Sequence, residues 1–170
     1  CGCTLFGLEC YKLEQLIDYL ETRNDIDAAR LGMAGLGLGG AATLMCTPLI
    51  ERVKAACAAG WFNHRTRKMV YADSRYRCSL DTDEGHVFIP GWLPDFSDSD
   101  LVSLICPRPF MAQTGKGDPI AWWTFVEAEW KKTKRYYKKL GIDDHAELVI
   151  HDGGHEMRSR YTIEFFRKWL

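Results

Sequence analysis

The stretch RLGMAGLGLGG, residues 30–40, decides the fold because it joins an uncharged run to a glycine-rich turn. Residues 30–34 are apolar after their arginine and bounded by glycine, which is the pattern of a buried strand. Residues 41–46 form a short apolar run that stops near Pro48, and they predict a helix. A strand that turns sharply into a helix presents the residue at the apex of the turn, and here the apex is Gly37.

Strands and helices alternate along the rest of the chain. Apolar runs of strand length predict buried strands, and apolar residues at helical spacing predict amphipathic helices. The predicted strands are 53–59, 110–113 and 147–150, and the predicted helices are 13–20, 122–140 and 161–170. This alternation predicts an α/β fold with a mostly parallel sheet and helices on both faces.

The composition is that of an ordinary soluble globular domain. The chain has 170 residues, 46% of them hydrophobic, and a net charge of −1 from 22 Lys+Arg against 23 Asp+Glu. Because this balance gives no broad positive field, we expect no nucleic-acid partner. The basic run at 131–139 follows Glu127 and Glu129 on the same predicted helix, which predicts a solvated face aligned with the helix dipole.

Two further patterns bear on the setting of the protein. Residues 31–50 are uncharged over a length that could span a bilayer, but five glycines and Pro48 favour a buried strand, turn and helix, so we expect no membrane span. Seven cysteines without a C-x-x-C pair favour reduced thiols and a reducing intracellular or organellar compartment. The chain opens with Cys1 and shows no signal peptide, so we expect a processed or partial chain.

Residues 61–100 break the alternation. They mix aromatic and charged residues with prolines and glycine, show no clear period, and are longer than a simple connection requires. We expect a loop or lid-like excursion over a site. Further along, Trp122 and Trp123 are either core anchors or site-lining aromatics, and the sequence does not choose between them.

Several short motifs follow one another in a recognisable order. They are LIDYL (16–20), DID (25–27), the stretch 30–40, ERVKAA (51–56), CPRPF (106–110), GDPI (117–120) and DGGHE (152–156). Through these motifs the chain resembles the α/β-hydrolase superfamily, and within it the esterases related to acetyl xylan esterases and dienelactone hydrolases. The resemblance covers nearly the whole chain. In this superfamily the sharp turn from strand to helix is the nucleophile elbow, and the order of elbow, acid and histidine along the chain agrees with the resemblance.

The resemblance implies roles for four residues. Asp118 matches the acid that orients the histidine, His155 matches the general base, and the amide of Leu38 matches one donor of the oxyanion hole. Gly37 falls where the nucleophilic serine of these esterases belongs. Because glycine has no side-chain atom that can attack a carbonyl, the acyl-enzyme route cannot run through this position.

The resemblance also implies that the first strands of the fold are missing. Residues 1–29 alone precede the predicted strand at 30–34, whereas the superfamily has several strands before its elbow. Residues 1–170 therefore correspond to the C-terminal portion of an α/β-hydrolase domain. Since an opening strand would expose an unpaired edge, we expect a partner there, either an N-terminal part of the same protein or a separate chain.

Three functional hypotheses share this fold. The first is a degenerate hydrolase-like protein, catalytically inactive, that acts as a binding or structural subunit with a small ester or acyl ligand, within a larger assembly. The second is a carboxylic ester hydrolase whose nucleophile has been substituted, so that Gly37→Ser would restore hydrolysis. The third is slow hydrolysis by a water molecule that His155 activates directly, without a covalent intermediate.

A dinucleotide-binding domain is a further alternative. Gly35, Gly37 and Gly40 satisfy G-x-G-x-x-G between a strand and a helix, but residues 55–61 lack the acidic residue that this fingerprint requires. The remaining histidines show no ligand spacing, so we assign no metal and no other cofactor. They are His64, His86, His145 and His151.

Overall fold

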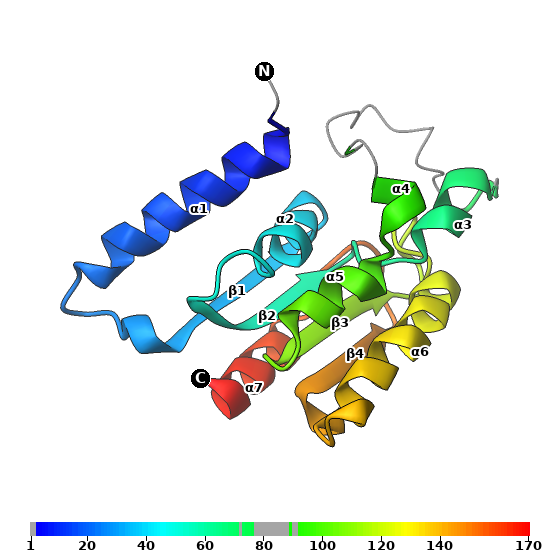
Figure 1. The fold of residues 1–170 in the computed structure, drawn as a ribbon. Helices are drawn as coiled ribbons and strands as arrows, with labels where there is room; N and C mark the ends of the chain where they lie inside the picture. The colour runs from blue at the N-terminus through cyan, green and yellow to red at the C-terminus, as the bar shows by residue number, and fades with distance from the viewer. Residues whose placement is uncertain (1–2, 72, 77–88, 90–91) are drawn as a thin grey trace.

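A parallel sheet of four strands forms the centre of the protein, as predicted. The computed structural model describes residues 3–71, 73–76, 89 and 92–170, so Cys1, Cys78 and His86 lie outside the described residues. The strands are β1 (Leu31–Leu36), β2 (Val53–Ala59), β3 (Phe110–Gly115) and β4 (Ala146–His151), and they lie side by side in chain order (Figure 1). All three pairings are parallel, which places the carboxyl ends of the strands, and the loops that follow them, at one edge.

Helices cover both faces of the sheet. Helices α2 (Leu38–Cys46), α5 (Asp98–Ile105) and α6 (Trp123–Lys139) pack on one face, where Leu44, Val102 and Trp130 join the main core. Helix α7 (Ser159–Trp169) covers the other face through Phe165. The small side chains of β2 let these layers approach the centre closely, because four of its seven residues are alanine.

Helix α1 (Leu5–Glu21) lies beside α2, next to the free edge of β1 (Figure 1). It begins eight residues before the predicted Leu13, because Thr4 caps its first turn by accepting a hydrogen bond from Gly7 N at 3.1 Å. Its buried Cys10 and Ile17 pack on residues of α2 and of the segment that enters β2. Leu16, which the helical spacing assigned to the packed face, is instead 49% exposed.

The elements elsewhere differ from the predictions mainly at their ends. Helix α2 begins at Leu38 rather than residue 41, and β3 extends to Gly115 rather than residue 113. The first turn of α2 was not predicted because it contains glycines, and glycine has low helix propensity. No helix among the described residues is long and apolar enough to cross a membrane.

The segment 61–100 holds more regular structure than expected. It contains α3 (Arg65–Val70), α4 (Trp92–Asp95) and the start of α5, which the sequence analysis missed. A capping box between Ser97 and Asp100 begins α5 and was the local signal for it. Tyr76 stacks on Trp122 with ring centroids 4.2 Å apart, so part of this segment is held against the start of α6.

One prediction about charge is wrong. Glu129 lies on the buried side of α6 rather than on a solvated face, and it accepts hydrogen bonds from the backbone N–H and hydroxyl of Ser99. Lys132 completes this cluster with an ion pair of 2.9 Å to Glu129 Oε2. The carboxylate therefore ties α6 to α5.

Candidate active site

Asp118 lies in the turn that follows β3. Its side chain is almost fully buried, and Oδ1 accepts hydrogen bonds from the N–H groups of Ile120 at 2.7 Å and Ala121 at 3.1 Å. Thr114 supports the same turn by donating its hydroxyl to the Ala121 carbonyl at 2.6 Å. These contacts fix the carboxylate and leave Oδ2 for another partner.

His155 supplies that partner from the loop after β4. Its Nδ1 lies 3.0 Å from Asp118 Oδ2. Because a carboxylate oxygen only accepts, Nδ1 donates in this pair, and in the neutral imidazole Nε2 then has the lone pair of a general base. The imidazole is therefore oriented as in an acid and histidine dyad.

Two backbone hydrogen bonds hold the two loops together. Lys116 N donates to the His151 carbonyl at 2.9 Å, and Gly117 N donates to the Gly153 carbonyl at 2.8 Å. The far end of the histidine loop is anchored on β3, since Arg158 N donates to Gln113 Oε1 at 3.1 Å. His155 is thus fixed at both ends of its loop.

Gly37 forms the sharp turn between β1 and α2. Its φ of 56° and ψ of −117° lie in the left-handed half of conformational space, where glycine is favoured. Its N–H donates to the Ala59 carbonyl at 3.0 Å, and its carbonyl accepts from Ala41 N at 2.9 Å. A Cβ atom on residue 37 would lie 2.8 Å from Nε2 of His155, so a side chain here would point at the base.

The Leu38 amide begins α2 directly after this turn. Among the described residues no acceptor is assigned to its N–H group, and the residue is 46% exposed. The first amides of a helix carry partial positive charge and stabilise a developing oxyanion placed against them. The structure therefore brings the four residues singled out from the sequence to one place: Gly37, Leu38, Asp118 and His155.

This geometry weighs against the dinucleotide alternative. A pyrophosphate would have to approach the backbone at the glycine turn, but His155 fills the space over Gly37. The strand after the turn, β2, ends at Ala59 and is followed by Gly60, with no carboxylate at either position. No group of three or more candidate ligands that could hold a metal ion occurs among the described residues.

The sequence analysis missed a buried ion pair beside the dyad. Arg65 donates to both carboxylate oxygens of Asp98, at 3.2 Å through Nε and 2.6 Å through Nη2. Its guanidinium group lies over the rings of both Trp61 and Trp92, with Cζ 4.8 Å from each centroid. This pair holds the segment that follows Gly60, where a Cβ atom would contact both His155 and Asp118.

An elbow after β1, an acid after β3 and a histidine after β4 on one parallel sheet are the arrangement of the α/β-hydrolase fold, and the chain has part of this fold. No family model matches the sequence. The protein "Putative hydrolase YtaP" of Bacillus subtilis is 24% identical over 173 residues, which cover 99% of this chain and 56% of that protein.

Solved structures agree with this assignment of the fold. A carbohydrate esterase family 15 glucuronoyl esterase from Caldicellulosiruptor kristjansonii superposes with a TM-score of 0.75 at 19% identity, covering 92% of this chain and 47% of that one. The methylesterase BT1017 has a TM-score of 0.67 at 23% identity, covering 95% and 34%. The acylaminoacyl peptidase of Pyrococcus horikoshii has a TM-score of 0.67 at 16% identity, covering 93% and 27%. The chain thus spans about half the length of the curated relative. It spans less than half the length of each of these three solved structures.

Proposed function

We propose that this chain carries a carboxylic-ester site of the α/β-hydrolase type that binds an ester or acyl group without forming an acyl-enzyme. The oriented base, the acid and the helix amide are the parts of an ester hydrolase site that remain after the nucleophile is taken away. Two of the similar structures are named as esterases, which favours an ester over other acyl compounds. The protein would then act as a binding or structural element.

The observation that carries this proposal is the approach of His155 to Gly37. An oxygen attached to a Cβ at residue 37 would be within hydrogen-bond reach of Nε2, because that Cβ itself would lie 2.8 Å away. Glycine supplies no such oxygen, so the base has no side-chain nucleophile to activate at this turn.

Gly37→Ser tests the proposal. We expect the variant to hydrolyse p-nitrophenyl acetate at least roughly 100-fold faster than the wild type, and to be labelled by a fluorophosphonate probe at the hydroxyl that the substitution introduces. The new side chain would be strained by about 1–3 kcal/mol in this backbone conformation, and the imidazole must shift slightly to admit it. Wild-type protein is expected to give no label at residue 37.

Gly39→Ser is the matched control. Residue 39 lies in the same turn of α2, but a Cβ there has no neighbour within 4 Å and faces open space. The hydroxyl of this control should remain unlabelled. A Gly37→Ser protein that is folded by circular dichroism yet neither labelled nor active would contradict the proposal.

A second candidate is an active carboxylic ester hydrolase whose serine has been substituted by Gly37. The hydrogen-bonded Asp118 and His155 favour it, since a site that no longer needs a base has no chemical reason to keep one oriented. Ordinary esterase rates in the protein with serine restored would favour this candidate. Rates far below those, with tight binding of an ester by the wild type, would favour the binding role.

We also propose that an extended segment pairs with the free edge of β1, contributed either by an N-terminal part of the same protein or by a separate chain. β1 pairs with β2 on one side only among the described strands. An apolar hollow of about 250 Å³ runs between this edge and α1, and its lining includes Leu16, Leu20 and Met33. Unpaired backbone groups beside exposed apolar side chains favour addition of a strand.

A further inference from the structure

An apolar groove runs along the outer face of α2, starting at the elbow. Leu38, Ala42, Met45 and Leu49 are spaced at three or four residues, so they line up on one side of the helix and its C-terminal turn. At the elbow end, Leu38 and Ala42 border a hollow of about 330 Å³ whose other wall is the start of α1. The first residues of this stripe therefore adjoin the amide of the candidate oxyanion site.

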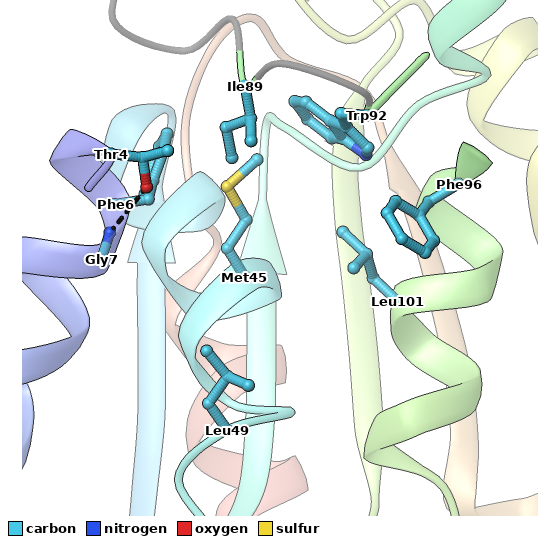
Figure 2. Close-up of a pocket in the computed structure, with 9 residues that line it drawn as sticks. All are labelled: Thr4, Phe6, Gly7, Met45, Leu49, Ile89, Trp92, Phe96 and Leu101. Carbon is cyan, nitrogen blue, oxygen red and sulfur yellow. Dashed lines mark hydrogen bonds between the residues drawn. The ribbon is translucent and has the colours of Figure 1, made fainter. Parts of the chain in front are cut away.

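The groove continues into a second hollow farther along the helix. Figure 2 shows Met45 on α2 and Leu49 in the turn that follows it, with Phe96 and Leu101 on the opposite wall and the start of α1 on the third side. This hollow has a volume of about 230 Å³. Phe6 lines both hollows, so the two hollows adjoin at this side chain.

The lining determines which ligand chemistry fits. Within the described part of the chain no charged residue lines the second hollow, and the one charged residue of the first, Glu9, is paired with Lys12 at 2.7 Å. Such a surface offers few hydrogen-bonding groups to a sugar or a peptide, whereas burial of apolar area favours a hydrocarbon chain. From Leu38 to Met45 the helix rises by about 10 Å, which matches an extended chain of roughly eight carbons.

We propose that this groove binds the unbranched aliphatic acyl chain of a medium-chain carboxylic ester or acid, with the carboxyl end at the Leu38 amide. This inference rests on the proposed function, because it takes the elbow as the place of the carbonyl group. It assigns the chain-length preference of the site to residues of α1, α2, α4 and α5. Methylene groups that enter the groove add to affinity by up to about 0.8 kcal/mol each.

Gly7 provides a variant that fills the groove without disturbing the fold. It lines the second hollow, and a Cβ atom on it would make only an ordinary contact of 3.5 Å with Thr4 Oγ1. Gly7→Leu should therefore occupy the space of the acyl chain, and it replaces glycine by a better helix former in α1. Gly7→Ala is its control, since one methyl group leaves most of the groove open.

Leu49 provides a second, independent variant. It is 68% exposed at the rim, so Leu49→Glu should place a charge beside the chain without unfolding the protein. Leu140→Glu is the matched control, because Leu140 is 61% exposed at the end of α6 and lines neither hollow.

The test is titration of the full-length protein with decanoate and with acetate, followed by tryptophan fluorescence, since Trp92 lines the second hollow. We expect saturable binding of decanoate but not of acetate, weakened at least roughly tenfold by Gly7→Leu and by Leu49→Glu and unchanged by the two controls. Equal binding by Gly7→Leu and wild type would overturn the inference. Absence of decanoate binding would also overturn it.

The Gly37→Ser background separates this inference from the proposed function. There, Gly7→Leu should lower kcat/KM for p-nitrophenyl octanoate at least roughly tenfold and leave kcat/KM for p-nitrophenyl acetate unchanged. Activity on the acetate ester, with no preference for the octanoate ester and no effect of Gly7→Leu, would overturn the acyl groove while leaving the ester site in place. Decanoate binding without any activity in Gly37→Ser would support the groove and contradict the ester site.

Discussion

Gly115 lies so close to the backbone of Gly153 and Gly154 that a Cβ atom on residue 115 would overlap their carbonyl oxygens. This approach, at the end of β3, lets the loop that carries Asp118 meet the loop that carries His155. The hydrogen bond from Gly117 N to the Gly153 carbonyl, at 2.8 Å, forms at the same contact. The dyad therefore depends on a backbone contact that only glycine permits.

Gly115→Ala should separate these loops. The methyl group has no flexible side chain to displace, so the backbone must move, at a cost of about 1–3 kcal/mol in the free energy of unfolding. Urea denaturation measures this loss, and in the Gly37→Ser background the hydrolysis of p-nitrophenyl acetate should fall with it. Gly154→Ala is the control, because a Cβ on Gly154 has no neighbour within 4 Å and should change stability by less than about 0.5 kcal/mol.

The order of the elbow, the acid and the histidine could be predicted from the sequence because each of them follows a predicted strand. Asp118 and His155 are 37 residues apart, and neighbouring parallel strands place the ends of β3 and β4 side by side. The hydrolase interpretation depends on this contact, because it requires the two side chains to lie within hydrogen-bond distance of each other. The strand 53–59 was also predicted with its observed bounds, since its apolar run ends in a clear turn signal.

Charged residues that become buried could not be located in the same way. Asp98 and Glu129 lie among polar residues in the sequence, and nothing local distinguishes them from a solvated helix face. Their partners, Arg65 and Ser99, are about 30 residues away along the chain. Only the packing of α5 against α6 and against the segment after β2 supplies these partners, so the pairing is a property of the fold.

Glu129 should make stability depend on pH. Burial alone would raise the pKa of its carboxyl, but the hydrogen bonds from Ser99 and the ion pair with Lys132 outweigh burial and hold the pKa below its usual value of 4.5. A carboxyl with a lowered pKa in the folded state stabilises the protein above its unfolded pKa and loses that contribution as the pH falls through the folded one. We therefore expect the contribution of Glu129 to be complete at neutral pH and to disappear at acidic pH below about 4.5.

Glu129→Gln tests this dependence by denaturation between neutral and acidic pH. The variant should be less stable by about 1–3 kcal/mol at neutral pH, because Lys132 and Ser99 lose their charged acceptor, and its stability should fall less steeply below about pH 4.5. Glu127→Gln, an exposed neighbour on α6, should keep the wild-type profile. Parallel acid limbs for wild type and Glu129→Gln would show that the carboxylate does not contribute in this way.

The buried cysteines should resist alkylation in the native protein. Burial raises the pKa of Cys46 to about 12 and that of Cys57 to about 11. At pH 8 the thiolate fraction of Cys46 is then only about 10⁻⁴, and the thiolate is the reactive form. Peptide mapping after brief treatment with iodoacetamide should find the exposed Cys3 modified and Cys46 and Cys57 unmodified, whereas denatured protein should react at all three. Equal labelling of Cys3 and Cys46 in native protein would contradict the buried packing of α1 on α2.

Hydrolysis by the wild-type chain, where it is detected, should depend on His155. Since Gly37 offers no side-chain nucleophile, the attacking atom would be the oxygen of water. His155 Nε2 would take the proton from that water as its oxygen bonds to the acyl carbon, and would return the proton to the departing alkoxide, which yields a carboxylic acid and an alcohol. His155→Ala should therefore lower the residual rate by about 10²–10⁴-fold.

Asp118→Asn should reduce the same residual rate by a different cause. An amide group in place of the carboxylate can donate to Nδ1, and this hydrogen bond would move the proton of the imidazole to Nε2, where the lone pair is needed. Burial of Asp118 and its two backbone hydrogen bonds, from Ile120 and Ala121, predict that the carboxamide keeps its position. The rate of p-nitrophenyl acetate hydrolysis measures both effects. His145→Ala is the control, at a half-buried histidine whose Nδ1 lies 2.8 Å from the Pro107 carbonyl. A residual rate that neither His155→Ala nor Asp118→Asn changes would show that water does not react through this dyad.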